Sequence, residues 1–376
     1  MMPKIPTSTS EWYTLKNPED ITSPALLVYP NRIEENIIKM ISIAEGTTTL
    51  RPHIKTHKTA EIVKMQQRHG IQKFKCATIA EAELLGQCEA EDVLLAMQPV
   101  GLNIERFFKL TKAYPNTQFS TLVDNTLTLS QICEFAIQEK TIVRLYLDIN
   151  NGMNRTGCIL NDQAINLYRT LDKHPHVSAM GFHAYDGHIH DSDLDKRREV
   201  CVKDFQPVLS FEAQLDSLGI DVPNIIAGGS PTFSLHNEYE GVETSPGTTL
   251  LWDAQYAEHF PNMDYLNAAV LLIRIISKPA KDILCFDLGH KSVACEMNLP
   301  RVTLLGLEDS TQISQSEEHL VVETQRAHEF EVGDCCYAIP MHICPTVAKY
   351  DELLVVQNGE IKEAWKVSAR NQRITI

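Results

Sequence analysis

A lysine between two histidines is the part of this sequence best suited to covalent chemistry. Lys55 lies in the run Leu50-Arg51-Pro52-His53-Ile54-Lys55-Thr56-His57-Lys58. A lysine at the end of a buried strand is poorly hydrated, which lowers its pKa and makes the amine a usable nucleophile or base. A solvated basic loop is the alternative, but the neighbouring histidines and Arg51 favour a functional lysine.

Two glycines followed by hydroxyl side chains indicate a site for an anion. Gly228, Gly229 and Ser230 follow the short apolar run 225–227, and Thr232 comes two residues later. Glycines let backbone N–H groups approach an anion closely, so we expect a phosphate here, with a plain turn as the alternative. A phosphate site together with a reactive lysine predicts the cofactor pyridoxal phosphate.

Two residues that soft metals prefer lie two positions apart near the end of the chain. His342 and Cys344 belong to the run Met341-His342-Ile343-Cys344-Pro345-Thr346. In an extended strand, which we expect here, these two side chains would share one face. Zinc takes both kinds of ligand, and two protein ligands leave positions open for water and substrate. A buried structural cysteine is the alternative.

Two further polar segments follow apolar runs. One contains Tyr185, His188, His190 and Asp191, and the other contains Asn154-Arg155-Thr156-Gly157. Each is a polar loop at a predicted strand end, and Arg155 would lie over the same opening as Tyr185. Neither segment alone identifies a functional site. A functional interpretation is favoured because all these segments would converge on one face of the same barrel.

Eight β segments, most of them separated by helical patterns, must position these residues. The predicted β segments are 49–55, 74–78, 93–96, 119–124, 142–149, 177–185, 225–227 and 242–251. This alternation predicts a parallel sheet with crossover helices, and eight units in about 230 residues favour a closed (β/α)8 TIM barrel of class α/β at residues 22–255. An open doubly wound sheet is the alternative. In a barrel the catalytic face lies at the carboxyl ends of the strands.

The hydrophobic pattern of the sequence changes after residue 255, where helical periodicity fades and β-like runs appear. Apolar β-like runs at 268–276, 283–287, 301–307, 320–324, 336–339 and 353–357 are separated by turn residues, and Asn358-Gly359 predicts a hairpin. We therefore expect a mostly antiparallel β domain of residues 256–376, together with residues 1–21, that carries the candidate metal pair.

Composition narrows the possible partners. The chain has 376 residues with 34 Lys and Arg against 49 Asp and Glu, a net charge of −15. This charge argues against nucleic acid or an anionic membrane as a partner. No apolar run approaches the ~20 residues of a membrane span, and residues 1–10 contain no apolar signal core. Ten cysteines without a pairing pattern predict reduced thiols in a cytoplasmic protein.

Three of these motifs resemble one known family. The lysine run, Gly228-Gly229-Ser230 and His342-Ile343-Cys344-Pro345-Thr346 are similar to motifs of the D-threonine aldolase and D-serine dehydratase family. Ala77-Thr78 with Glu81-Ala82-Glu83 extends the resemblance, which covers nearly the whole chain in the right order. Members of this family are pyridoxal-phosphate enzymes of the alanine-racemase-like fold, a barrel followed by a β domain.

The resemblance implies a role for each matching residue. Lys55, rather than Lys58, would hold the cofactor as a Schiff base, with Thr78, Arg155 and Tyr185 beside it. The phosphate would lie against Gly228, Gly229 and Ser230. His188 is a further catalytic candidate, and His342 and Cys344 would be the protein ligands of a divalent metal, zinc or else manganese.

The implied activity is that of a lyase acting on a small D-β-hydroxy-amino acid, by retro-aldol cleavage or by elimination of water. Cys344 favours zinc and elimination, because many aldolases of the family have Asp at this position. The family's basic histidine six residues after the tyrosine is Asp191 here, with His188 and His190 nearby. Residues 184–188 nevertheless look more like the aldolase type.

Two rival functions and the oligomeric state remain open at this point. A racemase would need Lys55 and a second acid/base but no metal pair, and a non-catalytic pyridoxal-phosphate carrier would resemble a lone barrel. We expect a homodimer.

Overall fold

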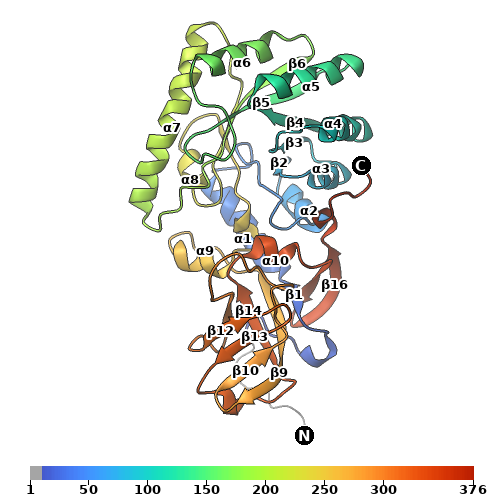
Figure 1. The fold of residues 1–376 in the computed structure, drawn as a ribbon, viewed down its shortest axis with the longest axis vertical. Coiled ribbons are helices and arrows are strands. Elements are labelled where there is room, and N and C mark those ends of the chain that lie inside the picture. The colour runs from blue at the N-terminus through green and yellow to red at the C-terminus, as the bar shows by residue number, and fades with distance from the viewer. Residues whose placement is uncertain (1–10) are drawn as a thin grey trace. The chain divides into compact units, whose positions relative to one another are not determined.

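The computed structural model describes residues 11–376, which form two compact units (Figure 1). The barrel unit contains residues 38–55, 62–247 and 371–376. The β unit contains, of the described residues, 11–37, 56–61 and 248–370. The predicted domain boundaries, 22–255 and 256–376 with 1–21, remain a proposal, and the predictions about residues 1–10 lie outside the described residues.

A parallel sheet forms the barrel unit, with its strands in sequential order, each paired with the next along the chain. Its seven strands within the described chain are β2 (Lys73–Cys76), β3 (Asp92–Leu95), β4 (Gln118–Val123), β5 (Val143–Ile149), β6 (Val177–Ala184), β7 (Ile225–Ala227) and β8 (Val242–Thr244). This order confirms the predicted α/β class and differs from that of a doubly wound sheet, in which the strand order reverses.

The predicted first strand, residues 49–55, is not a regular strand. It nevertheless lies between the two ends of the sheet, because Arg51 N–H donates to Thr244 O at 2.8 Å and Lys75 N–H donates to Pro52 O at 2.9 Å. Isolated bridges join Leu50 to Thr244 and His53 to Lys75. Pro52 has no N–H to donate, which explains why regular pairing is interrupted. The prediction was therefore right about position and wrong about regularity.

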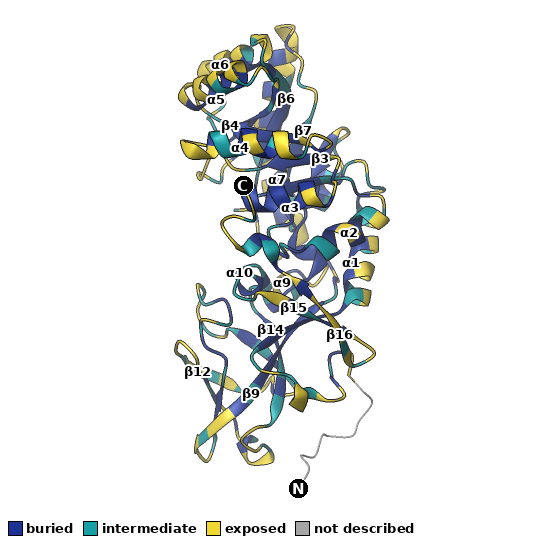
Figure 2. Cartoon of the chain, turned by 90° about the vertical axis from the view of Figure 1, so that its right-hand side faces the viewer, coloured by how far each residue is buried: buried dark blue, intermediate teal, exposed yellow. Residues whose placement is uncertain are grey.

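Helices connect the strands of the barrel unit and expose their outer faces, whereas the strands are buried (Figure 2). These helices are α2 (Ala60–Arg68), α3 (Ile79–Gln87), α4 (Leu102–Ala113), α5 (Thr126–Gln138), α6 (Asp162–Lys173), α7 (Leu194–Ser217) and α8 (Phe233–His236). α1 (Pro30–Ile43) begins in the β unit and ends in the barrel unit, and α9 (Ala254–His259) and α10 (Ile343–Val347) belong to the β unit. Asn125, Asn161 and Asp193 begin α5, α6 and α7 by accepting hydrogen bonds from first-turn N–H groups.

A mostly antiparallel sheet forms the β unit, and only the pairing of β1 with β15 within the described sheet is parallel. Its strands are β1 (Ala25–Val28), β9 (Ala269–Ala280), β10 (Ile283–Phe286), β11 (Val302–Leu305), β12 (Thr311–Gln315), β13 (Leu320–Glu323), β14 (Cys335–Pro340), β15 (Glu352–Gln357) and β16 (Glu360–Lys366). The six predicted segments all contain strands, whereas β1, β12 and β16 lie outside them.

The predicted hairpin at Asn358-Gly359 is confirmed. Asn358 and Gly359 connect β15 to β16 with φ values of 54° and 74°. Two successive positive φ values are what a tight two-residue hairpin turn requires, and asparagine and glycine adopt them at low cost.

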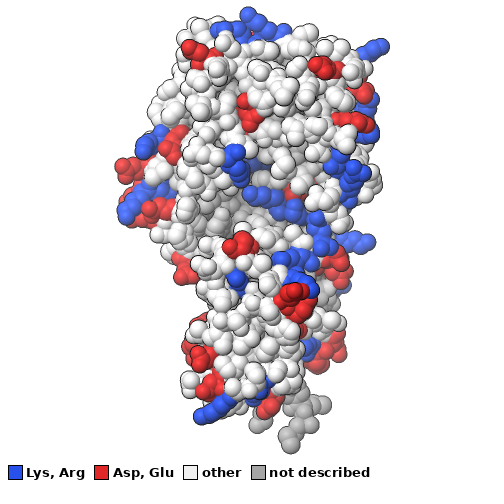
Figure 3. Space-filling view, viewed as in Figure 1, with Lys and Arg blue, Asp and Glu red and all other residues white. Residues whose placement is uncertain are grey.

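Within residues 11–376 no helix combines the length and the apolar character needed to cross a bilayer. On the face shown in Figure 3, acidic and basic side chains are interspersed.

Candidate active site

The carboxyl ends of the barrel strands carry the predicted cofactor residues. Lys55 follows the segment that closes the sheet, Arg155 follows β5, and Tyr185 follows β6. The segment Gly228–Ser230 follows β7 directly, and Ser245 follows β8. Because the ends of parallel strands meet on one face of a barrel, loops from five positions around the sheet contribute to this face.

Tyr185 is the point at which several cations converge. The Lys55 Nζ lies 5.5 Å from the centroid of the Tyr185 ring, and the Arg155 guanidinium carbon lies 5.0 Å from it. Lys75, on β2, lies 5.3 Å from the same centroid. Lys55 and Arg155, the two predicted residues, therefore lie within reach of the same aromatic ring. The structure brings Lys55, Arg155 and Tyr185 together.

The glycine loop after β7 passes close to this ring. Gly228 has a φ of +76°, in the left-handed region that favours glycine. A Cβ atom on Gly229 would lie 3.1 Å from Tyr185 Cε2, so this loop has no spare room beside the ring. The Ser230 hydroxyl accepts a hydrogen bond from Gly247 N–H at 3.1 Å. The loop is therefore fixed. Because Gly228 and Gly229 have no side chains, their backbone N–H groups are uncovered where the sequence predicts a phosphate.

Buried polar atoms without a partner offer an independent test of whether a polar ligand fits this face. Among the described residues, the Ser245 hydroxyl and both polar atoms of the Asn151 side chain are buried without a hydrogen-bond partner. Ser245 follows β8 and Asn151 follows β5, both at the carboxyl ends. Such groups are costly to leave unsatisfied. Together with an amine and a glycine loop, they fit a phosphorylated polar cofactor.

Two predicted residues have partners of their own in the structure. The Thr78 hydroxyl accepts from Glu81 N–H at 3.1 Å, while the Glu81 carboxylate accepts from Ala77 N–H at 2.7 Å. This reciprocal capping begins α3. His188 Nε2 pairs with Asp204 at 2.9 Å, and its Nδ1 is buried without a partner among the described residues. His190 and Asp191 are exposed.

A buried network that the sequence did not predict supports the glycine loop. Thr232 donates to Asp186 Oδ1 at 2.9 Å and accepts from Gly229 N–H at 3.1 Å. The other carboxylate oxygen of Asp186 pairs with His236 Nε2 at 2.7 Å. Since Asp186 directly follows Tyr185, this network connects the loop after β6 to the glycine loop after β7.

Cys201 joins Asp186 and His236 to form a group that could hold a metal, with ligand atoms all within 4.8 Å of one another. Two observations favour hydrogen bonding instead. Tetrahedral zinc, with bonds of about 2.0–2.3 Å, keeps its ligand atoms roughly 3.3–3.8 Å apart, whereas Asp186 Oδ2 and His236 Nε2 are 2.7 Å apart. Burial, and then the charges of Asp186 and Asp204, raise the pKa of Cys201 to about 12, so its thiol stays protonated.

The candidate metal pair lies in the β unit, but not on a strand as predicted. β14 ends at Pro340, His342 is the residue that precedes α10, and Cys344 lies in the first turn of α10. The helix begins here because Asp253 accepts from Ile343 N–H at 3.0 Å, and Pro345 is tolerated in a first turn. The expectation of an extended strand is therefore wrong.

His342 and Cys344 nevertheless remain together. The His342 imidazole hydrogen-bonds the Cys344 thiol and also Glu296, whereas Cys344 Sγ lies 3.1 Å from Thr56 Oγ1. Burial lowers the pKa of His342, but the hydrogen bonds with Cys344 and Glu296 outweigh it and raise the pKa to about 9. Anionic and sulfur groups around an imidazole favour a cation, which fits a divalent metal at this pair. Thr56 is the next residue after Lys55.

Sequence reasoning missed three buried polar residues of the barrel interior: Lys75, Asp148 and His183. Lys75 is a charged residue with a buried apolar neighbour on each side, Phe74 and Cys76. In a parallel sheet covered by helices both faces of a strand are buried, so a lysine in mid-strand was itself a signal. Asp148 and His183 lie near the ends of the predicted β segments 142–149 and 177–185, just before the two polar segments.

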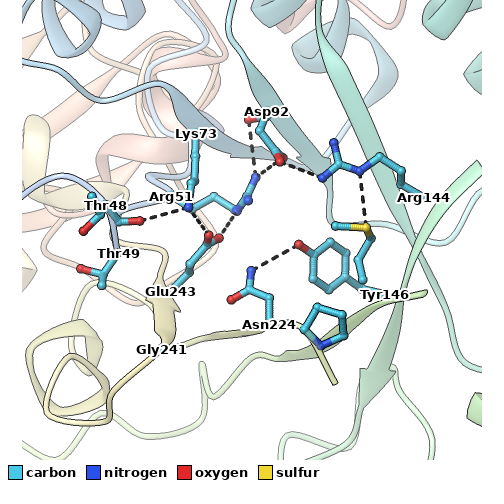
Figure 4. Close-up of a pocket in the computed structure, with 12 residues that line it drawn as sticks. Thr48, Thr49, Arg51, Lys73, Asp92, Arg144, Tyr146, Asn224, Gly241 and Glu243 are labelled. Carbon is cyan, nitrogen blue, oxygen red and sulfur yellow. Dashed lines mark hydrogen bonds and ion pairs between the residues drawn. The ribbon is translucent and has the colours of Figure 1, made fainter. Parts of the chain in front are cut away.

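A cavity of about 420 Å³ occupies the opposite, amino end of the barrel strands (Figure 4). Its ion pairs are complete: Arg51 contacts Asp92 and Glu243, each at 2.6 Å, while Lys73 pairs with Glu243 and Arg144 with Asp92. Because Arg51 belongs to the segment that closes the sheet, these pairs stabilise the closure. We therefore assign this cavity to stability rather than to chemistry.

Comparison with known proteins agrees with this geometry. Residues 28–254 match the family model described as "Alanine racemase, N-terminal domain", and residues 268–356 match "Putative serine dehydratase domain". The chain is 26% identical to D-threonine aldolase of Arthrobacter sp. over 358 residues, with 93% of each chain covered. It is 22% identical to D-serine dehydratase of Dictyostelium discoideum over 375 residues, covering 90% of this chain and 94% of that protein.

A solved structure extends the comparison to the fold. The crystal structure of D-threonine aldolase from Filomicrobium marinum has a TM-score of 0.86 and 22% identity, covering 94% of this chain and 96% of that chain. With a family model matching more than half of the chain, the predicted resemblance is confirmed. The chain belongs to the alanine-racemase-like family of pyridoxal-phosphate enzymes that includes D-threonine aldolase and D-serine dehydratase.

Proposed function

We propose that this protein is a pyridoxal-phosphate- and divalent-metal-dependent lyase acting on D-β-hydroxy-amino acids. The observation that carries the proposal is the convergence of Lys55, Arg155 and the glycine loop on Tyr185 at the carboxyl end of the barrel. Its relatives support the substrate class: they are named D-threonine aldolase, 3-hydroxy-D-aspartate aldolase and D-serine dehydratase, all for D-amino acids with a β-hydroxyl.

The residues of the barrel unit would divide the work as follows. Lys55 binds the cofactor covalently through its amine and then moves the proton at the substrate Cα. Backbone N–H groups of Gly228 and Gly229, with Ser230, hold the phosphate, and Arg155 and Tyr185 orient the ring. When bound, pyridoxal phosphate supplies an electron sink for negative charge at the substrate Cα. His188 is our candidate for an acid/base near the β-hydroxyl, and Thr78 remains a proposed cofactor neighbour.

His342 and Cys344 would hold the divalent metal. A thiolate and an imidazole favour zinc over manganese, which prefers oxygen ligands. Two solved variants of D-threo-3-hydroxyaspartate dehydratase replace a histidine and a cysteine two positions apart, and the cysteine variant is in metal-free form. The same spacing in this chain supports the proposal. The metal would supply a Lewis acid for the substrate β-hydroxyl, which explains the need for that hydroxyl.

Two reactions remain possible at this site, retro-aldol cleavage and elimination of water. Relatives of both kinds cover most of the chain. Cys344 favours elimination and the segment around Tyr185 favours cleavage, so we rank them equally. A racemase would not need the metal pair, and a cofactor carrier would not need the β unit. The homodimer stays a prediction.

A panel of amino acids tests this function. Purified protein with pyridoxal phosphate and zinc or manganese is offered D-threonine, D-serine and D-alanine with their L-isomers, and keto acids are measured against glycine plus aldehyde. We expect turnover of D-β-hydroxy substrates alone. Lys55→Ala should lose both the activity and the cofactor absorption band, whereas Lys58→Ala should keep the band. Interconversion of D- and L-alanine at rates matching any lyase reaction would overturn the proposal in favour of a racemase.

A further inference from the structure

Lys75 is a buried lysine for which the proposed reaction has so far no role. It lies on β2 beside the closing segment, where Ile54 N–H donates to Lys75 O at 2.9 Å. The residue is 2% exposed. A buried lysine is rare unless it is paired, yet among the described residues no carboxylate lies within ion-pair distance of its amine.

The partner of Lys75 is an imidazole. Lys75 Nζ lies 3.1 Å from His183 Nε2, and His183 Nδ1 lies 2.7 Å from Asp148 Oδ1. Burial, and then the charge of Lys75, lower the pKa of His183, so the ring is neutral. Hydrogen bonds from His183 and Gln98 outweigh burial and lower the pKa of Asp148, so this carboxyl is ionised. His183 therefore donates through Nδ1 to Asp148, and its Nε2 accepts from Lys75.

This chain of hydrogen bonds aims an amine at the same ring that Lys55 and Arg155 face. Lys55, Lys75 and Arg155 lie 5.5, 5.3 and 5.0 Å from the Tyr185 centroid. The charged and titratable groups around Lys75 are Lys55 and Arg51 on the closing segment, Asp148 on β5, His183 on β6, and Arg155 and Asp186 in the loops.

The two carboxylates in this set are already occupied. Asp148 accepts from His183, and Asp186 accepts from Thr232 and pairs with His236. Hydrogen bonds of this kind leave the carboxylates their charge, so three cations (Lys55, Arg155 and a protonated Lys75) stand against two carboxylates around Tyr185. Burial, and then the charge of Lys55, lower the pKa of Lys75 to about 7. An amine in this condition gains a proton when an anion arrives beside it.

We propose that Lys75 is a positioning residue that holds the anionic cofactor electrostatically and takes up a proton when the cofactor binds. The proposal rests on the proposed function, since it takes the phosphorylated pyridoxal as the anion. Its consequence is a linkage between binding and pH. Below pH 7 the ammonium is already formed and strengthens binding fully, and above pH 7 the proton must be taken from solvent, so the benefit decreases.

The test separates this effect from the covalent chemistry of Lys55. The probe is 4′-deoxypyridoxine 5′-phosphate, which keeps the cofactor's phosphate but has no aldehyde to react with an amine. Its Kd is measured by calorimetry on the full chain, freed of cofactor, from pH 6 to pH 9.5. The variants are Lys75→Met, which has similar length without charge, and Lys75→Arg, which keeps the charge at every pH. Lys73→Met is the matched control, because Lys73 lies on the same strand but pairs with Glu243.

We expect the ratio of the Lys75→Met Kd to the wild-type Kd to be largest below pH 7. It should fall by about tenfold or more between pH 7 and pH 9, because a neutral lysine holds an anion no better than methionine does. Lys75→Arg should keep tight binding without this fall, and Lys73→Met should follow the wild type throughout.

Several outcomes would overturn the proposal. Equal Kd values for wild type and Lys75→Met at every pH would refute it, as would a ratio that does not change with pH. Failure of the wild type to bind either this probe or pyridoxal phosphate would instead refute the proposed function. If Lys75→Met does not fold by circular dichroism, proton uptake on binding at pH 8 is compared between wild type and Lys75→Arg in buffers of different ionisation enthalpy. Greater uptake by the wild type supports the proposal, and equal uptake refutes it.

Discussion

Replacing Thr232 with valine tests whether the buried network holds the glycine loop in place. The change keeps the shape of the side chain and removes its hydroxyl. That hydroxyl accepts from Gly229 N–H at 3.1 Å and donates to Asp186 Oδ1 at 2.9 Å. All three residues are buried, so valine leaves one N–H and one carboxylate oxygen without these partners.

The expected magnitude follows from these two lost bonds. Each buried polar group that loses its partner costs about 1–3 kcal/mol, so the two groups left by Thr232→Val should lower the free energy of unfolding by about 2–6 kcal/mol. If about 1.4 kcal/mol is needed to restore the loop around the phosphate, the affinity for pyridoxal phosphate falls about tenfold. Urea unfolding of the apoprotein measures the first quantity, and titration with the cofactor measures the second.

A matched control makes the result interpretable. Thr170 is exposed on α6 and donates to Asn166 O at 2.8 Å, so Thr170→Val makes the same chemical change away from the network. It should alter the free energy of unfolding by no more than about 0.5 kcal/mol. Our reasoning about the network fails if Thr232→Val behaves like this control in both assays. Loss of bound metal from Thr232→Val or Cys201→Ser would instead mean that Asp186, Cys201 and His236 hold a metal.

Three further predictions concern the cofactor loop, the metal pair and pH. Gly229→Val should weaken cofactor binding without unfolding the β unit, because its Cβ would lie 3.1 Å from Tyr185 Cε2; normal binding in a titration would place the phosphate elsewhere. Chelation, or Cys344→Ala, should abolish lyase activity and leave the cofactor absorption band intact, and full activity after verified metal removal would refute the metal role. Burial, and then the charge of Lys55, lower the pKa of Lys75 in the folded apoprotein from 10.5 to about 7. Between these two pH values the unfolded protein binds more protons than the folded protein, so the free energy of unfolding should rise with pH. Lys75→Met should lack this rise in urea unfolding measured from pH 7 to pH 10, and an unchanged slope would contradict it.

The barrel could be predicted because its signal is local and repeated. Each short apolar run followed by an amphipathic helix adds one strand to a parallel sheet, so errors of a few residues at a boundary do not change the order. The two failures have causes that a run of apolar residues does not reveal, one of them local and the other a contact distant in sequence. Pro52 interrupts pairing in the first segment, and a hydrogen bond from Ile343 to Asp253, 90 residues away in sequence, begins a helix where a strand was expected.

The candidate site was predictable to a different extent. Tyr185 and the glycine loop directly follow strands, and Lys55 ends the segment that closes the sheet, so their place at the carboxyl ends is a consequence of the fold alone. The partners of Asp186 could not be found in this way. Its contacts with Thr232 and His236 join loops 46 and 50 residues apart, and nothing in the local sequence distinguishes these residues from other polar loop residues.

The two ends of the barrel use charge in different ways, and this difference locates the chemistry. At the amino end Arg51, Lys73 and Arg144 each contact a carboxylate of Asp92 or Glu243, so the charges stabilise the closed sheet and no ligand is needed (Figure 4). At the carboxyl end three cations surround Tyr185, while the nearby carboxylates are bound by imidazoles. Of these cations Lys75 is buried, Lys55 is half-buried and Arg155 is exposed, and an unpaired cation at a buried position is unfavourable until an anion arrives. The energy lost in the free protein therefore reappears as affinity for a phosphorylated ligand at this end of the barrel.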